Sequence, residues 1–369
     1  MNSFATDNII PRLTQALAEV AEIIAVYTSK NEILFKASPL IDTQFHHNEI
    51  ISRFSQLGYR AEIIADQPTL VVRLKSLEIQ SRQAFPWTPI VLFIATVITT
   101  LLTGALYEGL NLFSNPETLW QNPLLVISQG FPFSFSLLSI LVVHEFGHYI
   151  AGRIHGVNMS LPYFIPAPPG ITIIGTFGAV IKSRSAFINR KQLLDVGASG
   201  PLAGLIISIV VFAIGINGSP LREIPENVSG LMMVGDSLLN SLMVTLLKGP
   251  IPENQTLVFN SVAFAGWVGL LVTMLNLLPI GHLDGGHIVY ALVGKKQRLV
   301  AGLILVGLLI LSFYWAGWIF WIIFGIILRP AHPPTLLDEI PLGNGRIFVG
   351  YLSMAIFVLC FMPIPFAIT

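Results

Sequence analysis

Two histidines and a glutamate stand together in an apolar stretch of the chain, in the pattern His144-Glu145-x-x-His148. On a helix, residues four apart lie one above the other, so both imidazoles can reach one metal ion. The glutamate projects beside that face, near enough to act as a general base on an attacking water. The pattern is typical of zinc-dependent peptide hydrolysis. It predicts His144 and His148 as zinc ligands and Glu145 as the catalytic base.

The alternative is that these are incidental polar residues at a helix end. The apolar surroundings argue against that interpretation. Each ionisable group inside a bilayer costs about 2.5–3.5 kcal/mol or more, so three of them within five residues need compensation. A bound metal ion compensates two imidazoles directly.

A second polar segment, residues 276–287, follows another apolar stretch. Catalytic zinc usually has three protein ligands, and Asp284 is the predicted third one. Pro279 breaks a helix and Gly281 permits a tight turn, so this backbone is expected to line the site. The alternative for Asp284 is an N-cap of the next helix. Asn276 either donates a hydrogen bond to a peptide carbonyl or oxyanion, or belongs to a helix-ending turn.

Three further histidines are candidate ligands. His155 lies two turns beyond His148, after a basic residue, and is expected not to bind the metal. His282 and His287 flank Asp284, where contacts to the ligands or to substrate are possible. The predicted metal site therefore keeps three ligands.

The composition defines the class of protein. The chain has 369 residues, with 20 basic and 20 acidic side chains, and only 11% are charged while 53% are hydrophobic. Soluble globular chains carry about 25% charged residues. This excludes a disordered chain, a basic nucleic-acid binder and most soluble enzymes. The single cysteine, Cys360, excludes a disulfide scaffold. An α-helical polytopic membrane protein is predicted.

Residues 1–85 hold much of the charge and predict a small soluble α+β domain. The periodicity indicates helices over Ile9–Val26 and Asn48–Leu57, and strands over Glu32–Lys36, Arg60–Ala65 and Thr69–Leu74. Residues 86–369 are expected to form the transmembrane metalloprotease domain.

About six to seven transmembrane helices are predicted, each needing about 20 mostly apolar residues. The candidate spans are Pro89–Leu110, Pro132–Ala151, Val196–Ile216, Leu257–Leu278 and Ile347–Ala367, with one or two more in Leu299–Leu328. Val228–Leu247 has a polar face and predicts an interfacial helix. In the third span, Gly200-x-x-x-Gly204 permits close helix packing.

The basic residues set the predicted orientation. Sixteen of the 20 Lys and Arg residues lie in the N-terminal domain or in the segments after the second and fourth spans. By the positive-inside rule these parts face the cytoplasm, in a prokaryotic plasma membrane or a thylakoid-type membrane. Both metal-ligand segments lie near that side.

The paired motifs resemble the site-2 protease family of intramembrane zinc metalloproteases, in its cyanobacterial, archaeal and plastid branch. The motifs that carry the resemblance are His144-Glu145-Phe146-Gly147-His148, Asn276-x-x-Pro279-x-x-x-Leu283-Asp284-Gly285-Gly286, and the intervening Gly175–Ile181, Asn189-Arg190 and Gly197–Gly204. The resemblance covers roughly residues 86–369. It implies one zinc ion per chain on His144, His148 and Asp284, and Glu145 as the base.

The same resemblance implies transmembrane protein substrates within a lipid bilayer and no nucleic-acid partner. The expected function is hydrolysis of peptide bonds within or near transmembrane helices. The alternative is a transporter or ion pathway that uses the same buried polar residues. No internal repeat is visible, and a transporter gives no reason for a glutamate directly after the first histidine.

Overall fold

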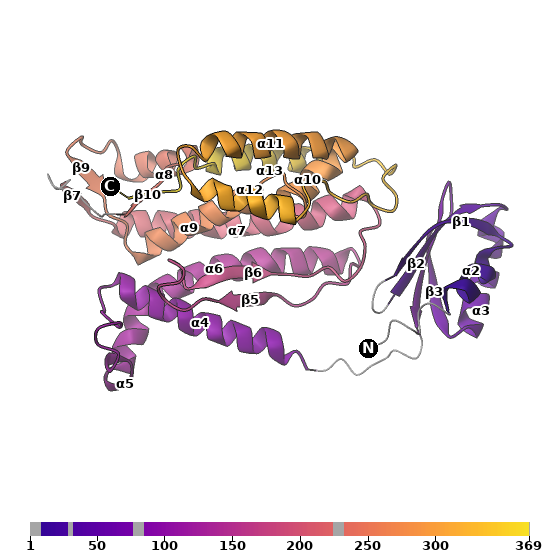
Figure 1. Ribbon diagram of the computed structural model, residues 1–369, viewed down its shortest axis with the longest axis horizontal. Helices are drawn as coiled ribbons and strands as arrows, with labels where there is room; N and C mark the ends of the chain where they lie inside the picture. Colours follow the sequence, from indigo (N-terminus) through magenta and orange to yellow (C-terminus); the bar gives the residue numbers. More distant parts are fainter. Residues whose placement is uncertain (1–8, 29–31, 77–84, 224–231, 369) are drawn as a thin grey trace. The chain divides into compact units, whose positions relative to one another are not determined.

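The computed structural model describes residues 9–28, 32–76, 85–223 and 232–368. The chain divides into two compact units. The first contains residues 1–86 together with Ser183–Ile188, and the second contains Trp87–Lys182 and Asn189–Thr369. Figure 1 shows a small sheet with two helices in the first unit and a mostly helical body in the second.

The first unit holds a four-stranded antiparallel sheet with strand order β1-β2-β4-β3. Its elements are α2 (Ile10–Leu17), β1 (Ala21–Thr28), β2 (Glu32–Pro39), the 3-10 helix η1 (Thr43–His46), α3 (His47–Gln56), β3 (Tyr59–Ala65) and β4 (Leu70–Ser76). Side chains alternate along a strand, so every second residue of β2 and β4 faces the same side. There Phe35 and its cross-strand partner Val72 share one core with Leu17 of α2 and Phe54 of α3.

The helix predicted over Ile9–Val26 is wrong in its second half. Helix α2 ends at Leu17, and Ala21–Thr28 forms strand β1. The β-branched residues Ile23, Ile24 and Val26 favour a strand, and Ile23 and Val26 pair with residues of β2. The apolar spacing alone is compatible with both structures.

The second unit is built from helices packed around α6, α7 and α9. Its helices are α4 (Trp87–Tyr107), α5 (Thr118–Gln121), α6 (Pro123–Ile154), α7 (Arg190–Gly218), α8 (Leu238–Lys248), α9 (Ser261–Asn276), α10 (Asp284–Val293), η2 (Gly294–Lys296), α11 (Gln297–Leu311), α12 (Gly317–Ile327) and α13 (Asn344–Cys360). Three two-stranded sheets pair β5 (Tyr163–Pro166) with β6 (Thr176–Val180), β7 (Leu221–Glu223) with β9 (Gln255–Leu257), and β8 (Met232–Val234) with β10 (Phe366–Ile368).

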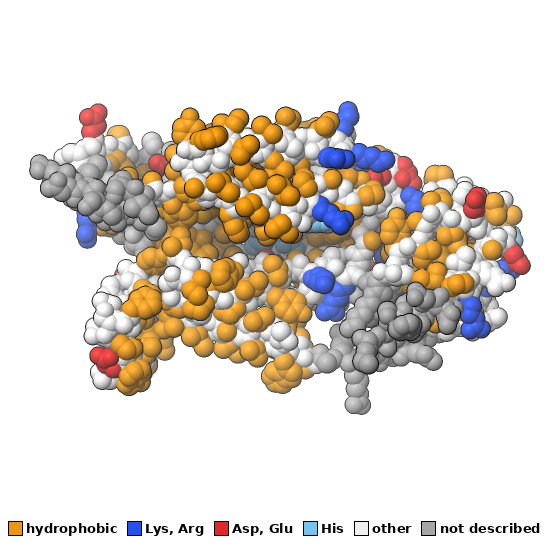
Figure 2. Space-filling view, in the orientation of Figure 1, with side chains coloured by type: hydrophobic (Ala, Val, Ile, Leu, Met, Phe, Trp, Pro, Cys, Tyr) orange, Lys and Arg blue, Asp and Glu red, His pale blue; other side chains and the backbone are white. Residues whose placement is uncertain are grey.

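Three of the described helices, α4, α6 and α7, are long and apolar enough to cross a membrane, judged by length and composition. Helices α8, α9, α12 and α13 are apolar but shorter. In Figure 2 hydrophobic side chains cover the outer faces of α4, α11 and α12. Leu303, Ile310 and Phe320 are among the exposed ones. Such a surface suits lipid rather than water.

The sequence left open whether Leu299–Leu328 forms one helix or two. The structure divides this stretch into two helices, α11 and α12. The chain turns between Leu311 and Gly317, where the indole of Trp315 lies against the Cα of Gly317 and leaves no room for a Cβ. Helix α6 begins at Pro123, well before the predicted Pro132. Proline is tolerated inside membrane helices because neighbouring groups satisfy the freed backbone.

Two predicted elements near the C-terminal end of the second unit differ from the structure. The span predicted over Ile347–Ala367 ends as a helix at Cys360, because the prolines that follow cannot continue it, and strand β10 comes next. The helix predicted over Val228–Leu247 begins only at Leu238, capped by Ser237. Residues 228–231 of that prediction lie outside the described residues, and Met232–Val234 is a strand.

Candidate metal centre and active site

Helix α6 carries both histidines of the predicted site. His144 and His148 are buried and lie on one face of the helix, with their Nε2 atoms 3.2 Å apart. Two nitrogens bound to one tetrahedral zinc ion would lie about 3.3 Å apart. The helix therefore holds the two imidazoles at coordinating separation.

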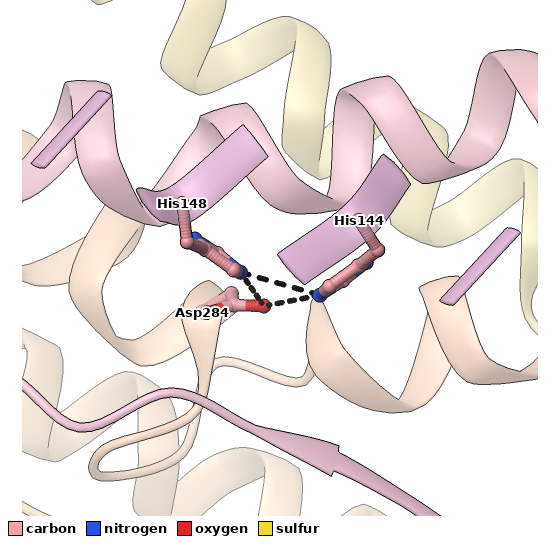
Figure 3. A group of neighbouring side chains, drawn as sticks. All are labelled: His144, His148 and Asp284. Atoms are coloured by element: carbon pink, nitrogen blue, oxygen red, sulfur yellow. Dashed lines mark hydrogen bonds and ion pairs between the residues drawn. The ribbon is translucent and has the colours of Figure 1, made fainter. Parts of the chain in front are cut away.

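Asp284 reaches the histidines from a broken segment between two helices. Helix α9 ends at Asn276, Pro279 interrupts the helix, and Gly281 adopts φ +51°, a conformation that favours glycine. Asp284 then begins helix α10. Its Oδ2 atom lies 3.5 Å from Nε2 of His144 and 3.3 Å from Nε2 of His148, and Figure 3 shows the three side chains pointing toward one another.

The donor set fits a zinc ion. One atom from each of His144, His148 and Asp284 lies within 4.8 Å of the others. Two imidazole nitrogens and one carboxylate oxygen form the three-ligand set of a catalytic zinc site, which leaves a fourth position open. Among the described residues, it is the one group of three whose ligand atoms already lie this close together.

The backbone of α7 fixes the orientation of His148. Its Nδ1 atom lies 2.7 Å from the carbonyl oxygen of Val196. A carbonyl only accepts hydrogen bonds, so Nδ1 carries the proton and Nε2 keeps its lone pair toward the cluster. A partner of this kind is usual behind metal-binding histidines and raises their affinity for the ion.

Glu145 is buried beside the cluster, with 6% of its surface exposed. It interacts electrostatically with both histidines and with Asp284. A carboxylate at that place can accept a proton from a water molecule near the cluster and release it to a departing group. Asn276 also faces the cluster, with Nδ2 3.3 Å from Nε2 of His144.

Two glycines of α7 pack directly against the two histidines of α6. A Cβ on Gly204 would lie 3.1 Å from the Cβ and Nδ1 of His144, and one on Gly200 would overlap the ring of His148. The four-residue spacing of the glycines matches that of the histidines. The predicted close packing at Gly200-x-x-x-Gly204 therefore occurs at the metal centre itself.

His155 lies outside the metal cluster and joins an ion-pair network instead. Its Nε2 atom lies 2.8 Å from Oδ2 of Asp195, and Arg346 of α13 donates two hydrogen bonds to the same oxygen. Asp195 precedes Val196, whose carbonyl orients His148. The network therefore ties α6, α7 and α13 together beside a proposed ligand.

Replacing Asp195 by asparagine is expected to lower the unfolding midpoint of the purified protein. The loss corresponds to about 1–2 kcal/mol, because charged hydrogen bonds are strong but this group is partly exposed. A thermal shift measurement in detergent checks it. Arg346→Lys, which keeps the charge but loses the paired geometry, is the matched variant and should show a smaller decrease. An unchanged midpoint for Asp195→Asn would contradict the assigned role.

The two remaining histidine candidates, His282 and His287, do not belong to the three-residue cluster. They lie beside His332, for which the sequence predicted no role. Val196, Asp195 and Arg346 were also missed. Their roles depend on contacts between distant segments, and no local motif marks them.

The chain resembles known proteins over much of its length. Residues 132–314 match the model of peptidase family M50. The probable zinc metalloprotease EGY2, chloroplastic, of Arabidopsis thaliana is 30% identical over 316 residues, covering 82% of this chain and 54% of that protein. The probable zinc metalloprotease EGY1, chloroplastic, of the same plant is 30% identical over 245 residues, which cover 64% of this chain and 44% of that protein. The probable zinc metalloprotease EGY2, chloroplastic, of Oryza sativa subsp. japonica is 29% identical over 310 residues, which cover 82% of this chain and 54% of that protein.

The fold and the site define a mostly helical, membrane-embedded protein with a zinc-type donor set and a small N-terminal sheet domain. The segment 132–314 belongs to peptidase family M50, the site-2 protease family that its motifs indicate. It spans about half the length of the curated relatives it matches. The comparisons give no support to the transporter alternative.

Proposed function

We propose that the chain is an intramembrane zinc metalloprotease that hydrolyses peptide bonds within or near transmembrane helices of other proteins. The observation that carries this proposal is the convergence of His144, His148 and Asp284 beside the buried Glu145. The two histidines come from a helix long and apolar enough to cross a bilayer. A hydrolytic centre on such a helix suits substrates that lie in the membrane.

In this proposal His144, His148 and Asp284 hold one zinc ion through Nε2, Nε2 and Oδ2. Zinc supplies Lewis acidity, which lowers the pKa of water and polarises a carbonyl. Glu145 takes the proton from the attacking water and passes it to the leaving amine when the peptide bond breaks. Asn276 is placed to donate a hydrogen bond from Nδ2 to the substrate carbonyl as it gains negative charge.

The membrane arrangement is part of the proposal. About six to seven helices cross the bilayer, with residues 1–85 as a soluble domain on the cytoplasmic side of a prokaryotic plasma membrane or thylakoid-type membrane. The long apolar helices α4, α6 and α7 and the basic segment 182–191 support this orientation. The substrate helix has to unwind locally, because a helical carbonyl is bonded and shielded within its own turn.

Removal of zinc is the direct test. The full chain, reconstituted in vesicles with a single-span model substrate, should cleave it, and a zinc chelator should reduce the rate at least about a hundredfold. Readdition of zinc should restore cleavage, which is followed by the appearance of membrane fragments. Inhibitors of serine and cysteine proteases should have no effect. Cleavage that persists in metal-free protein would contradict the proposed function.

A further inference from the structure

Three histidines gather next to the metal centre without belonging to it. Nδ1 of His287 lies 2.7 Å from Nε2 of His332, and their ring centres are 4.8 Å apart. The ring of His282 lies 5.8 Å from that of His332 and 6.3 Å from that of His287, centre to centre. His282 is exposed and the other two are half-buried, so the cluster opens toward the outside. Figure 2 shows histidine side chains in the furrow between the apolar surfaces of the second unit.

The segment that brings His332 to this place is held firmly. The buried side chain of Gln297 accepts a hydrogen bond from the backbone N–H of His332 and donates to the carbonyls of Pro330 and Pro279. The N–H of Gly281 also donates to the carbonyl of Pro330. The chain after α12 is therefore fixed against the turn that carries His282.

The side chains around His332 leave one of its nitrogens without a partner. Nδ1 of His332 is buried and makes no hydrogen bond with any described residue. The ring of Tyr290 packs against His332, while the Tyr290 hydroxyl donates to Asp338. It is Nε2, the other ring nitrogen of His332, that faces His287.

We propose that His282, His287 and His332 form a second zinc site, separate from the one on His144, His148 and Asp284. Imidazole is a favoured ligand of zinc, and three histidines form one of its known catalytic sets. The centres of two imidazoles on one tetrahedral ion lie about 5 Å apart. The rings of His287 and His332 have nearly that spacing, and an ion between Nδ1 of His287 and Nε2 of His332 would replace the hydrogen bond that now joins them. The exposed ring of His282 completes the set by turning toward them.

The two sites share a short piece of chain. His287 lies one turn after Asp284 on α10, and His282 lies two residues before it. An ion on the histidine cluster would lie at the outer side of the proposed active centre. Its binding depends on these imidazoles alone, so the inference does not require that the chain be a protease.

Zinc stoichiometry tests the inference. The full chain in detergent is stripped with chelator, titrated with zinc ions and assayed for metal by mass spectrometry. Wild type should bind about two ions per chain, His144→Ala/His148→Ala about one, and His282→Asn/His332→Asn about one. Replacing all four histidines should leave none. His46→Asn, a histidine variant in the N-terminal unit, should still bind about two, and size-exclusion chromatography checks that each variant is folded.

Two results would overturn the second site. One is a folded His144→Ala/His148→Ala protein that binds no zinc, with wild type binding a single ion. The other is a His282→Asn/His332→Asn protein that still binds two ions, which would place the second ion elsewhere. The single variant His282→Asn changes an exposed side chain, so it keeps the test valid if substitution of His332 disturbs folding. A wild-type protein that binds two ions but cleaves no substrate would count against the proposed protease alone.

Discussion

Replacing Glu145 by glutamine is expected to reduce peptide-bond cleavage about a thousandfold while the protein keeps its zinc. The glutamine side chain has nearly the same size and fills the same buried place, but it cannot take a proton from water at neutral pH. The ligand atoms of His144, His148 and Asp284 are untouched by this change. Cleavage of the model substrate and metal content are measured on the same preparation.

Measuring cleavage and zinc content together distinguishes a catalytic role of Glu145 from a role in supporting the metal ligands. Glu117→Gln, at a partly exposed position before α5, makes the same chemical change far from the ligands in sequence and should leave cleavage and zinc unchanged. Glu145→Asp keeps the carboxylate but shortens the side chain, and should show an intermediate rate. Wild-type cleavage by Glu145→Gln would assign the base to another residue, and loss of zinc would show that Glu145 supports the ligands.

The sequence predicted the helical membrane class well because its evidence is local. Long apolar stretches separated by charged segments need no tertiary information, and α4, α6 and α7 lie where such stretches occur. Helix ends were predicted less well. Pro132 lies inside α6, and Ile23 to Val26 lie in a strand, because neighbouring elements supply the packing and hydrogen bonds that decide between alternatives.

The candidate site shows the same division. Two histidines at a helical spacing and an aspartate in a broken segment predict a metal-binding group from the sequence alone. The groups that orient this cluster are backbone and long-range contacts. The carbonyl of Val196 orients His148 from 48 residues away in the sequence. Asp195 and Arg346, which form an ion pair, are 151 residues apart. No spacing rule connects positions so far apart.

The contact between α6 and α7 also explains why small residues are needed opposite the ligands. Both helices are apolar, and they pack tightly where His144 and His148 project. Any side chain on α7 at that level competes with an imidazole for the same space. The position of the metal centre therefore depends on an absence of side-chain atoms in α7 as much as on the ligands in α6.

Gly200→Ala is therefore expected to remove zinc and cleavage together, without unfolding the protein. An added Cβ would lie 2.5 Å from Cε1 of His148 and nearer still to Nε2, so the ring has to move by about 1 Å or more. A displacement of that size costs about a hundredfold in rate. Alanine favours a helix over glycine by about 1 kcal/mol, which offsets part of the crowding and keeps α7 formed.

A graded series of glycine variants distinguishes this steric effect from a general loss of stability. Gly302 of α11 has no atom within 4 Å of an added Cβ, so Gly302→Ala should keep full zinc content and cleavage. Gly204→Ala, with its nearest His144 atoms at 3.1 Å, should fall between the two. Metal content, unfolding midpoint and cleavage are measured for all three. A Gly200→Ala protein with full zinc content would show that His148 coordinates from another position, and the geometry proposed for the site would then be wrong.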